Sequence, residues 1–433
     1  MKKYNTSTLL DRFLRYVRID TQAHEKASTY PSSPGQWELG RLLCDELRAL
    51  GIQDVEQDEH GLVFATIPAT VPAAPTIAFL AHLDTSPETS GRNVQPQVIR
   101  DYPGGDIVLP GDRRQVIRVA DNPELNHLIG KTLITTDGTT LLGADDKAGV
   151  AVIMEACRIL CEDSTIPHGP IRIVFTCDEE IGKGVLYLDP DRIGAVVAYT
   201  LDGTGAGEIE AETFSADLAL ITITGANIHP AIAKGRMINA VRLAAKFLER
   251  LPQLHYSPET TSDREGFIHP YVIEGGVAQV TIRCLLRDFE TPRLAEYAHW
   301  LREIGGQIER DYPGSRVQVT VQPQYRNMRD GIAREPRAVA YALEAVRRAG
   351  LQPQLKSIRG GTDGALLTAK GLPTPNLSCG EHNFHSPLEW TCLEELESAV
   401  HVVLELCQVW AGRLSCWCRQ VGKIPTRPAW SGT

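Results

Sequence analysis

Histidine and acidic side chains follow three apolar runs of this sequence. The runs cover residues 78–81, 174–176 and 197–200, and their composition is typical of strands buried on both faces. If these strands belong to one open α/β sheet, their carboxyl ends meet at one crevice, and the side chains that follow converge there. Imidazole and carboxylate groups are ligands that zinc and similar divalent metals prefer. The side chains in question are His82, Asp84, Glu179, Glu180 and Asp202.

Two further segments carry candidate ligands. Asp145 and Asp146 come directly before an apolar helical pattern. An aspartate at a helix start is favoured as an N-cap, so we expect one of the pair to cap the helix and the other to project into the crevice. The second segment is the loop over residues 379–387, which contains His385. With two histidines and at least four carboxylates, the set exceeds the needs of one metal ion. It suits two ions about 3.5 to 4 Å apart that share a bridging carboxylate and a nucleophilic water.

The elements that position these residues form an α/β domain interrupted by a smaller one. We predict helices at about 36–50 and 146–162 and strands at 76–83, 171–177 and 195–201, which indicates a three-layer α/β/α domain. From Phe214 the order changes to strand, helix, strand, strand, helix, strand, with helices at about 237–251 and 292–310 and a strand at 317–321. That order is typical of an α+β ferredoxin-like insertion.

The expected domain boundaries follow from this change of pattern. Residues 1–213 and 326–411 would make up the catalytic domain, 214–325 a lid or dimerisation domain, and 412–433 a basic, disordered tail. In the last helix, Thr391 and Glu394 have the spacing of a capping box.

Composition excludes several classes of protein. The 433 residues include 44 Lys and Arg against 54 Asp and Glu, a net charge of −10, which argues against binding to nucleic acid or an anionic membrane. No apolar run reaches the length of about 18 residues that spans a bilayer. The 10 cysteines show no disulfide or zinc-finger spacing. We therefore expect a soluble protein of the reducing cytoplasm.

Several strings of the sequence resemble one family. They are Ala81–Pro87, Thr136–Gly149, Asp178–Glu180, Asn227–Pro230, Arg287–Phe289 and Ile358–Gly364. Together they are similar to the tripeptide aminopeptidases of the peptidase T subfamily, within the dinuclear zinc metallopeptidases related to aminoacylases and carboxypeptidases. The resemblance extends from the first helix to about residue 410. It implies a metallo-aminopeptidase that releases the N-terminal residue of tripeptides with two Zn²⁺ per subunit.

The resemblance also implies roles for individual residues. It places His82 and Asp202 on one zinc ion and Glu180 and His385 on the other, with Asp145 bridging both. Asp84 would accept a hydrogen bond from the first histidine and fix its tautomer. Glu179 would be the general base that takes a proton from the attacking water and passes it to the leaving amine.

Four more residues match substrate-contacting positions of that subfamily. His229 matches a lid histidine that donates to the oxyanion in the active site of a partner subunit, so a homodimer is implied. The others are Asn239, Arg287 and Arg359, of which the arginines suit a carboxylate. The sequence departs from the family pattern at Ala231-Ile232, at Thr204 and at Ser386-Pro387, but none of these departures removes a ligand.

Two other functions remain open from the sequence. Another dinuclear zinc amidohydrolase, such as a dipeptidase or an aminoacylase, would share every metal ligand. A peptide-binding relative without catalysis is the second alternative, against which Glu179 and the full ligand set argue. A glycine-rich string at 203–207 looks like the start of a dinucleotide fingerprint, but a strand pattern follows it instead of a helix.

Overall fold

The computed structural model describes residues 4–412. Apart from Gly412, the predicted tail lies outside the described residues. The chain divides into two units, the first made of residues up to 209 with 335–355 and 376 onward, and the second of residues 210–334 with 356–375. The second unit thus begins near the expected residue 214 but extends to 334 and also takes in a later segment. Its strand β14 (Arg316–Tyr325) contacts helix α9 (Asp363–Ala369), which accounts for that addition.

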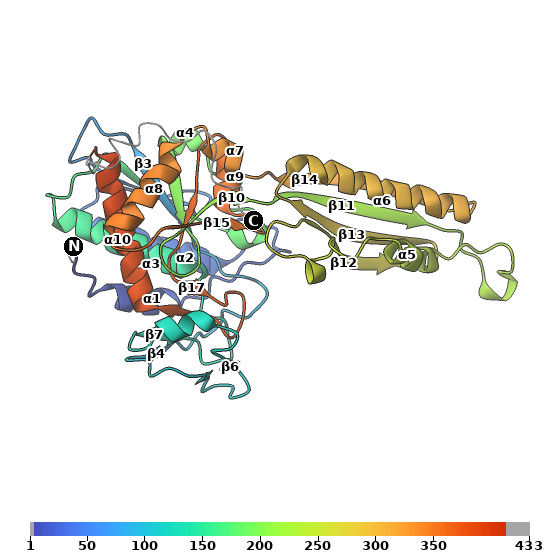
Figure 1. Ribbon diagram of the computed structural model, residues 1–433, viewed down its shortest axis with the longest axis horizontal. Coiled ribbons are helices and arrows are strands. Elements are labelled where there is room, and N and C mark those ends of the chain that lie inside the picture. The colour runs from blue at the N-terminus through green and yellow to red at the C-terminus, as the bar shows by residue number, and fades with distance from the viewer. Residues whose placement is uncertain (1–3, 413–433) are drawn as a thin grey trace. The chain divides into compact units, whose positions relative to one another are not determined.

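The fold is α/β, as expected, and the main sheet, of which Figure 1 labels β3, β10 and β15, mixes parallel and antiparallel strands. Within residues 4–412 it has eight strands in the order β1-β2-β8-β3-β9-β16-β10-β15. The division between the units passes through β10 and β15. The strands are β1 (Asp54–Gln57), β2 (Val63–Ile67), β3 (Ile77–His82), β8 (Ile171–Thr176), β9 (Val197–Leu201), β10 (Glu208–Thr213), β15 (Gln354–Ile358) and β16 (Asn376–Leu377).

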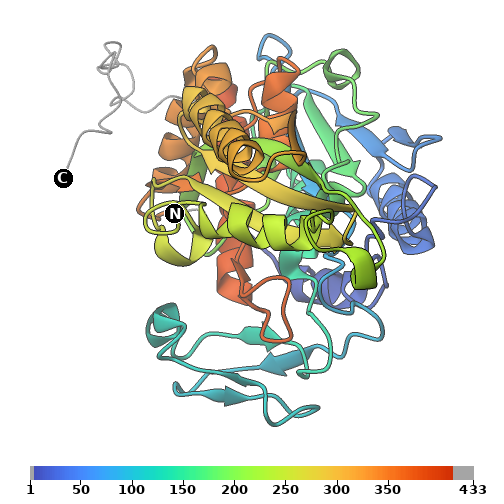
Figure 2. The same cartoon turned by 90° about the vertical axis from the view of Figure 1, so that its right-hand side faces the viewer.

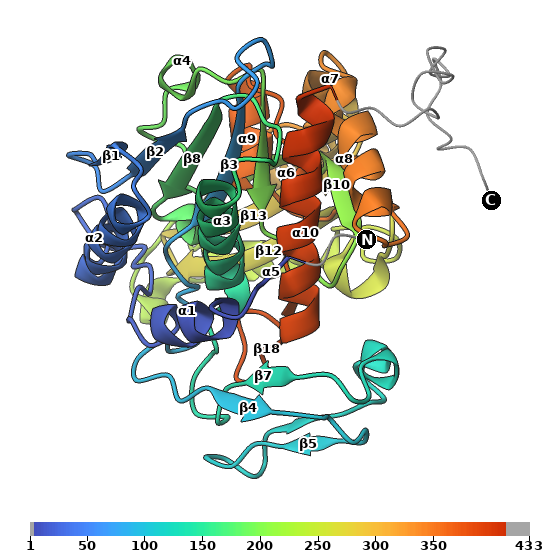
Figure 3. The same ribbon diagram turned by 90° about the vertical axis from the view of Figure 1, so that its left-hand side faces the viewer.

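Helices of the first unit pack on this sheet and on one another. The predicted helix after Asp146 is α3, which contacts β3 and β9 and is buried over almost its whole length. Figure 3 shows α10 beside α3, and α10 contacts both α3 and α8. This unit contains α1 (Leu9–Tyr16), α2 (Pro34–Ala49), α3 (Ala144–Glu162), α4 (Pro190–Ile193), α8 (Arg337–Arg348) and α10 (Leu393–Trp410).

The predicted capping box at the start of α10 is wrong. The N-cap is Cys392, without a side-chain cap, and Thr391 belongs to strand β18. The carboxylate of Glu394 instead accepts a hydrogen bond from the backbone N–H of Thr132, at 3.0 Å from Oε2. A partner distant in the sequence has therefore replaced the local one.

A small sheet, which the sequence did not predict, lies beside the loop of His385. Among the described residues its order is β17-β18-β7-β4, and Trp390 of β18 pairs with Thr135 of β7. Figure 2 shows the blue-green strands of residues 97–135 below the main body of the first unit, next to the orange segment that precedes α10. The strands are β4 (Gln97–Ile99), β7 (Leu133–Thr135), β17 (Glu381–His382) and β18 (Trp390–Cys392), with β5 (Ile107–Val108) and β6 (Val116–Ile117) paired nearby.

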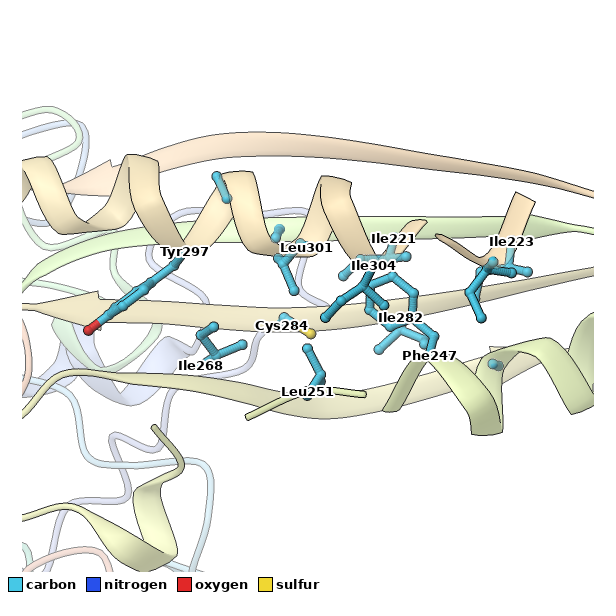
Figure 4. Packing of buried hydrophobic residues seen from close by; sticks show 14 of the residues in the cluster. Ile221, Ile223, Phe247, Leu251, Ile268, Ile282, Cys284, Tyr297, Leu301 and Ile304 are labelled. Carbon is cyan, nitrogen blue, oxygen red and sulfur yellow. The ribbon is translucent and has the colours of Figure 1, made fainter. Parts of the chain in front are cut away.

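The second unit has the predicted ferredoxin-like order. Its antiparallel sheet runs β12-β13-β11-β14, and α5 and α6 fill the places of the two expected helices. Alternate residues of β11 and β13 are buried, so one face of the sheet packs against both helices. In Figure 4, Tyr297, Leu301 and Ile304 of α6 meet Ile282 and Cys284 of β13. The elements are β11 (Ser215–Thr224), α5 (Ala240–Glu249), β12 (Phe267–Gly275), β13 (Gln279–Asp288), α6 (Thr291–Asp311), β14 (Arg316–Tyr325) and α7 (Arg329–Ile332).

No helix among residues 4–412 has the length and hydropathy needed to cross a lipid bilayer.

Candidate metal centre

The ends of three parallel strands form the base of the candidate site. β3 pairs in parallel with β8 on one side and with β9 on the other. His82 is the last residue of β3, Glu179 and Glu180 follow β8, and Asp202 follows β9. All of them belong to the first unit. Because the carboxyl ends of parallel strands open on the same edge, the topology brings these side chains together.

Asp145 lies between two histidines. Its Oδ1 is 2.9 Å from Nε2 of His82, and its Oδ2 is 3.1 Å from Nε2 of His385. The same nitrogen of His385 is 2.9 Å from Oε2 of Glu180. A carboxylate whose two oxygens face two different imidazoles has the geometry of a ligand shared between two metal ions.

Among residues 4–412, four groups of donor atoms could each hold a cation, and two of these groups share His82. One group is His82, Asp145 and Glu180, the other is His82, Asp146 and Asp202, and within each group the donor atoms lie no more than 4.8 Å apart. Oε1 of Glu180 is buried and has no hydrogen-bond partner among the described residues. A buried carboxylate oxygen without a donor is costly unless a cation faces it. Nitrogen and oxygen donors of this kind fit zinc or a similar divalent ion.

Burial and mutual contact shift the pKa values of these groups. Burial raises the pKa of Glu180 to about 8, and the charge of Asp145 acts in the same direction. Burial alone would lower the pKa of His385, but hydrogen bonds to Asp145 and Glu180 raise it to about 11. Burial would raise the pKa of Asp145, yet hydrogen bonds from both histidines hold it below its ordinary value. The carboxylates are thus in an environment where positive charge is strongly favoured.

Asp84 joins the strand of His82 to the turn after β8. It is fully buried, and its two carboxylate oxygens accept the backbone N–H groups of Glu179 and Glu180 at 3.0 and 3.1 Å. Nδ1 of His82 lies 3.1 Å from the backbone oxygen of Asp84 and 3.5 Å from its Oδ1. Asp84 therefore orients the imidazole and also holds the two glutamates in place.

The two adjacent aspartates have different partners. Oδ2 of Asp146 accepts the backbone N–H of His82 at 2.9 Å, and its Oδ1 accepts the N–H of Gly149 at 3.0 Å, as an N-cap would. Asp145 faces the histidines instead. This agrees with the prediction that one of the two successive acids caps the helix and the other projects into the site.

Other polar side chains near the site were missed from the sequence. Cys379 and Glu381 follow β16, which pairs in parallel with β9, so the same strand-end rule could have found them. The thiol of Cys379 donates to Oε1 of Glu381 at 3.2 Å, and Glu381 has a carboxylate oxygen within 4.8 Å of ligand atoms of Asp145 and Asp202. Glu389 is buried as well and accepts hydrogen bonds from the turn before Asp145. No motif signals that contact.

The four predicted substrate-contacting residues all belong to the second unit. Nδ1 of His229 accepts the N–H of Ala231 at 3.2 Å and caps a short 3-10 helix. Oδ1 of Asn239 accepts the N–H of Val241 at 2.9 Å, as the N-cap of α5. Both side chains therefore have a local structural role.

The two arginines also bind backbone oxygens within the second unit. Arg287 donates to the carbonyl of its neighbour Leu286 at 3.1 Å. Arg359 donates to the carbonyls of Asp263 and Glu265 at 3.0 and 2.9 Å, and its guanidinium lies 5.2 Å from the centre of the Phe214 ring. A substrate role for these residues remains a prediction.

Comparison with known proteins identifies the family. The sequence pattern of peptidase family M20/M25/M40 matches residues 137–409, more than half of the chain. The chain belongs to this peptidase family, which confirms the resemblance seen in its motifs.

Individual relatives are similar over nearly the whole length. Peptidase T of Geobacillus thermodenitrificans is 44% identical over 408 residues, which cover 94% of this chain and 99% of the relative. Peptidase T of Escherichia fergusonii is 44% identical over 405 residues, 93% of this chain and 98% of the relative. The crystal structure of aminopeptidase PepT from Bacillus cereus aligns with a TM-score of 0.73 at 27% identity and covers 94% of this chain and 99% of that one.

Proposed function

We propose that this chain is a metallo-aminopeptidase that releases the N-terminal residue from tripeptides. Its membership of peptidase family M20/M25/M40 and its 44% identity to proteins named Peptidase T support the activity and the substrate class. The observation that carries a dinuclear mechanism is Asp145, whose two oxygens face His82 and His385.

Two zinc ions fit the donor set of the site. We assign His82 and Asp202 to one ion, Glu180 and His385 to the other, and Asp145 to both. Oε1 of Glu180, buried without a donor among residues 4–412, supports this assignment because a cation would satisfy it. When bound, such ions would lower the pKa of a coordinated water and polarise a carbonyl group.

The residues of the chain then move the proton and position the peptide. Glu179 lies in the turn after β8, and its backbone is held by the hydrogen bond to Asp84. It takes the proton of the attacking water and delivers it to the leaving amine as the bond after the N-terminal residue breaks. Glu180 is used as a ligand, so adjacent carboxylates have different tasks, as in other sites with two carboxylates.

The second unit contributes substrate contacts in this proposal. Arg287, Arg359 and Asn239 would bind the peptide, and His229 would donate to the oxyanion in the active site of a partner subunit. The enzyme is then a homodimer formed through the ferredoxin-like unit and acts in the cytoplasm. Sedimentation at working concentration tests the dimer.

One assay tests the function directly. Di-, tri- and tetrapeptides, with free and blocked N-termini, are incubated with zinc-loaded and with chelator-treated protein. We expect hydrolysis only of free N-termini, fastest for tripeptides, and only by the zinc-loaded protein. Equal hydrolysis of blocked peptides would instead identify an aminoacylase-like enzyme, and hydrolysis that survives the chelator would exclude the metal mechanism.

A further inference from the structure

Glu389 is a buried carboxylate that accepts hydrogen bonds from the turn formed by residues 142–145, at the start of α3. Its Oε2 accepts the backbone N–H groups of Leu142 and Gly143 at 2.7 and 2.8 Å, and its Oε1 accepts the N–H of Asp145 at 3.1 Å. Only 1% of the residue is exposed. A buried carboxylate that accepts several backbone N–H groups in this way holds a segment firmly in one conformation.

The turn needs such an acceptor. Gly143 has a φ of +82°, and Asp145 and Asp146 have non-helical φ/ψ values, so the N–H groups at this point do not enter the hydrogen bonds of α3. Buried N–H groups at a helix start require an outside partner. Because Glu389 binds the N–H of Asp145 itself, it fixes the backbone from which this side chain extends between the histidines.

Glu389 is also the end of the loop that carries His385. The N–H of Glu389 donates to the carbonyl of Ser386 at 3.2 Å, and the hydroxyl of Ser386 donates to the carbonyl of Asn383 at 2.7 Å. The amide of Asn383 in turn donates to the carbonyl of Leu388 at 3.2 Å. These bonds close the loop on itself, so that Glu389 and His385 keep a fixed spacing.

Strand pairing places this end of the loop next to the turn. Trp390, the residue after Glu389, pairs with Thr135 of β7, and the chain runs from there toward residue 142. One side chain thus connects the two segments that carry Asp145 and His385.

We propose that Glu389 is a positioning residue that sets the distance between Oδ2 of Asp145 and Nε2 of His385. It thereby sets the position of the metal ion assigned to Glu180 and His385. The inference rests on the dinuclear site of the proposed function. Glu389 touches neither substrate nor metal in this proposal and acts through the backbone of the turn.

The test compares Glu389→Gln with a matched control. Glutamine keeps the size of the side chain but turns an N–H₂ group toward backbone N–H donors. The control is Asp58→Asn, because Asp58 is also buried, 4% exposed, and its Oδ1 accepts the N–H groups of His60 and Leu62 at 2.9 and 3.0 Å in the loop between β1 and β2. Its Oδ2 also pairs with Arg192 at 2.6 Å, so the control removes a charge as well as a backbone acceptor. Zinc affinity of the full chain is measured by competition with a chromophoric chelator, beside the melting temperature of the metal-free protein.

We expect Glu389→Gln to bind the weaker of its two zinc ions about 10- to 100-fold less tightly, the range typical of groups that orient ligands. Glu389→Asp, which keeps the charge on a shorter side chain, should show a smaller loss and serves as the test if the glutamine variant does not fold. Asp58→Asn should lower the melting temperature and leave zinc affinity unchanged. Raising the zinc concentration should restore activity to Glu389→Gln.

Two results would overturn the inference. One is native zinc affinity in both Glu389 variants, and the other is an equal loss of affinity in Asp58→Asn. Failure of the proposed function gives a different result, because the native chain itself would then bind fewer than two zinc ions.

Discussion

The candidate site in the first unit and the predicted substrate-contacting residues of the second unit use their polar side chains differently. In the first unit, imidazole and carboxylate groups from separate elements face one another, as when Asp145 meets both His82 and His385. In the second unit, Asn239 and Arg359 bind backbone atoms of their own unit. Polar groups gathered from distant segments are expensive to bury without a ligand, whereas a polar group bound to nearby backbone is already satisfied. Side chains that need a ligand therefore mark the candidate site, whereas side chains already bound to backbone have a structural role.

The largest effect should come from the candidate base. Glu179→Gln should lower kcat about 10²- to 10⁴-fold, because the variant lacks a proton acceptor, while zinc content stays at the native level. His385→Ala should lower zinc content as well as kcat, because it removes a ligand. Steady-state kinetics and metal analysis check both, with the exposed Glu59→Gln as control. Equal zinc loss in the first two variants would mean that the base is misassigned.

Substitution of Arg359 tests most sharply whether the polar residues of the second unit have a structural role or bind substrate. Arg359→Ala should reduce the free energy of unfolding by about 3 kcal/mol, because it removes hydrogen bonds to several carbonyls and a contact with an aromatic ring. Urea unfolding measures this loss, and metal analysis should show native zinc content. A raised KM at native stability would show instead that the guanidinium binds substrate and that the contrast between the units is false.

A smaller, pH-dependent effect on stability is expected from substitution of His382. Its ring stacks on Trp390 with ring centres 3.7 Å apart. Burial would lower its pKa, but hydrogen bonds to Glu124 and Glu395 raise it to about 9. Because the folded pKa lies above the ordinary value of about 6.5, the stabilisation is complete below pH 6.5 and is lost as the pH rises through about 9.

Urea unfolding at several pH values measures this effect. At pH 6 the free energy of unfolding of the native protein should exceed that of His382→Gln by on the order of 2 kcal/mol, and this difference should shrink by pH 10. A difference that does not change with pH would show that packing on Trp390, rather than charge, stabilises this part of the loop.

The smallest effect is expected at the N-cap of α5. Asn239→Ala should cost about 1 kcal/mol of stability, whereas Asn239→Asp should be neutral, because aspartate caps a helix as well as asparagine does. KM for a tripeptide should be native in the aspartate variant if the residue only caps. A raised KM in a stable Asn239→Asp protein would show that the amide also contacts the substrate.

Much of the fold was predictable because hydrophobic periodicity is a local property. The helix expected at about 292–310 is α6, Thr291–Asp311, and the strand expected at 76–83 is β3, Ile77–His82. The β-α-β-β-α-β order of the second unit was also correct, because each element shows its own period. The prediction of a capping box at Glu394 was wrong because this carboxylate accepts a hydrogen bond from the backbone N–H of Thr132, which is distant in the sequence.

The candidate site was predictable where its residues follow the carboxyl ends of neighbouring parallel strands, and it was not predictable elsewhere. His82 and Asp202 end neighbouring parallel strands, so their convergence follows from the order of elements. Glu389 has no such signal, because its contact with residue 145 depends on the pairing of β18 with β7, two strands of three residues each. Strands this short carry too little periodicity to be seen in a sequence.

The sequence by itself determined the classes of side chain available for chemistry, the two kinds of unit and, through its motifs, the family. These properties reside in residue types and short spacings, which need no folded chain to be read. Only the tertiary structure decided that Asp146 accepts the backbone N–H of His82, that Asp84 holds Glu179 and Glu180 by their backbone, and that Arg359 binds carbonyl groups. Each of these outcomes depends on which donors and acceptors the packed chain brings within about 3 Å, a distance set by contacts between residues far apart in sequence.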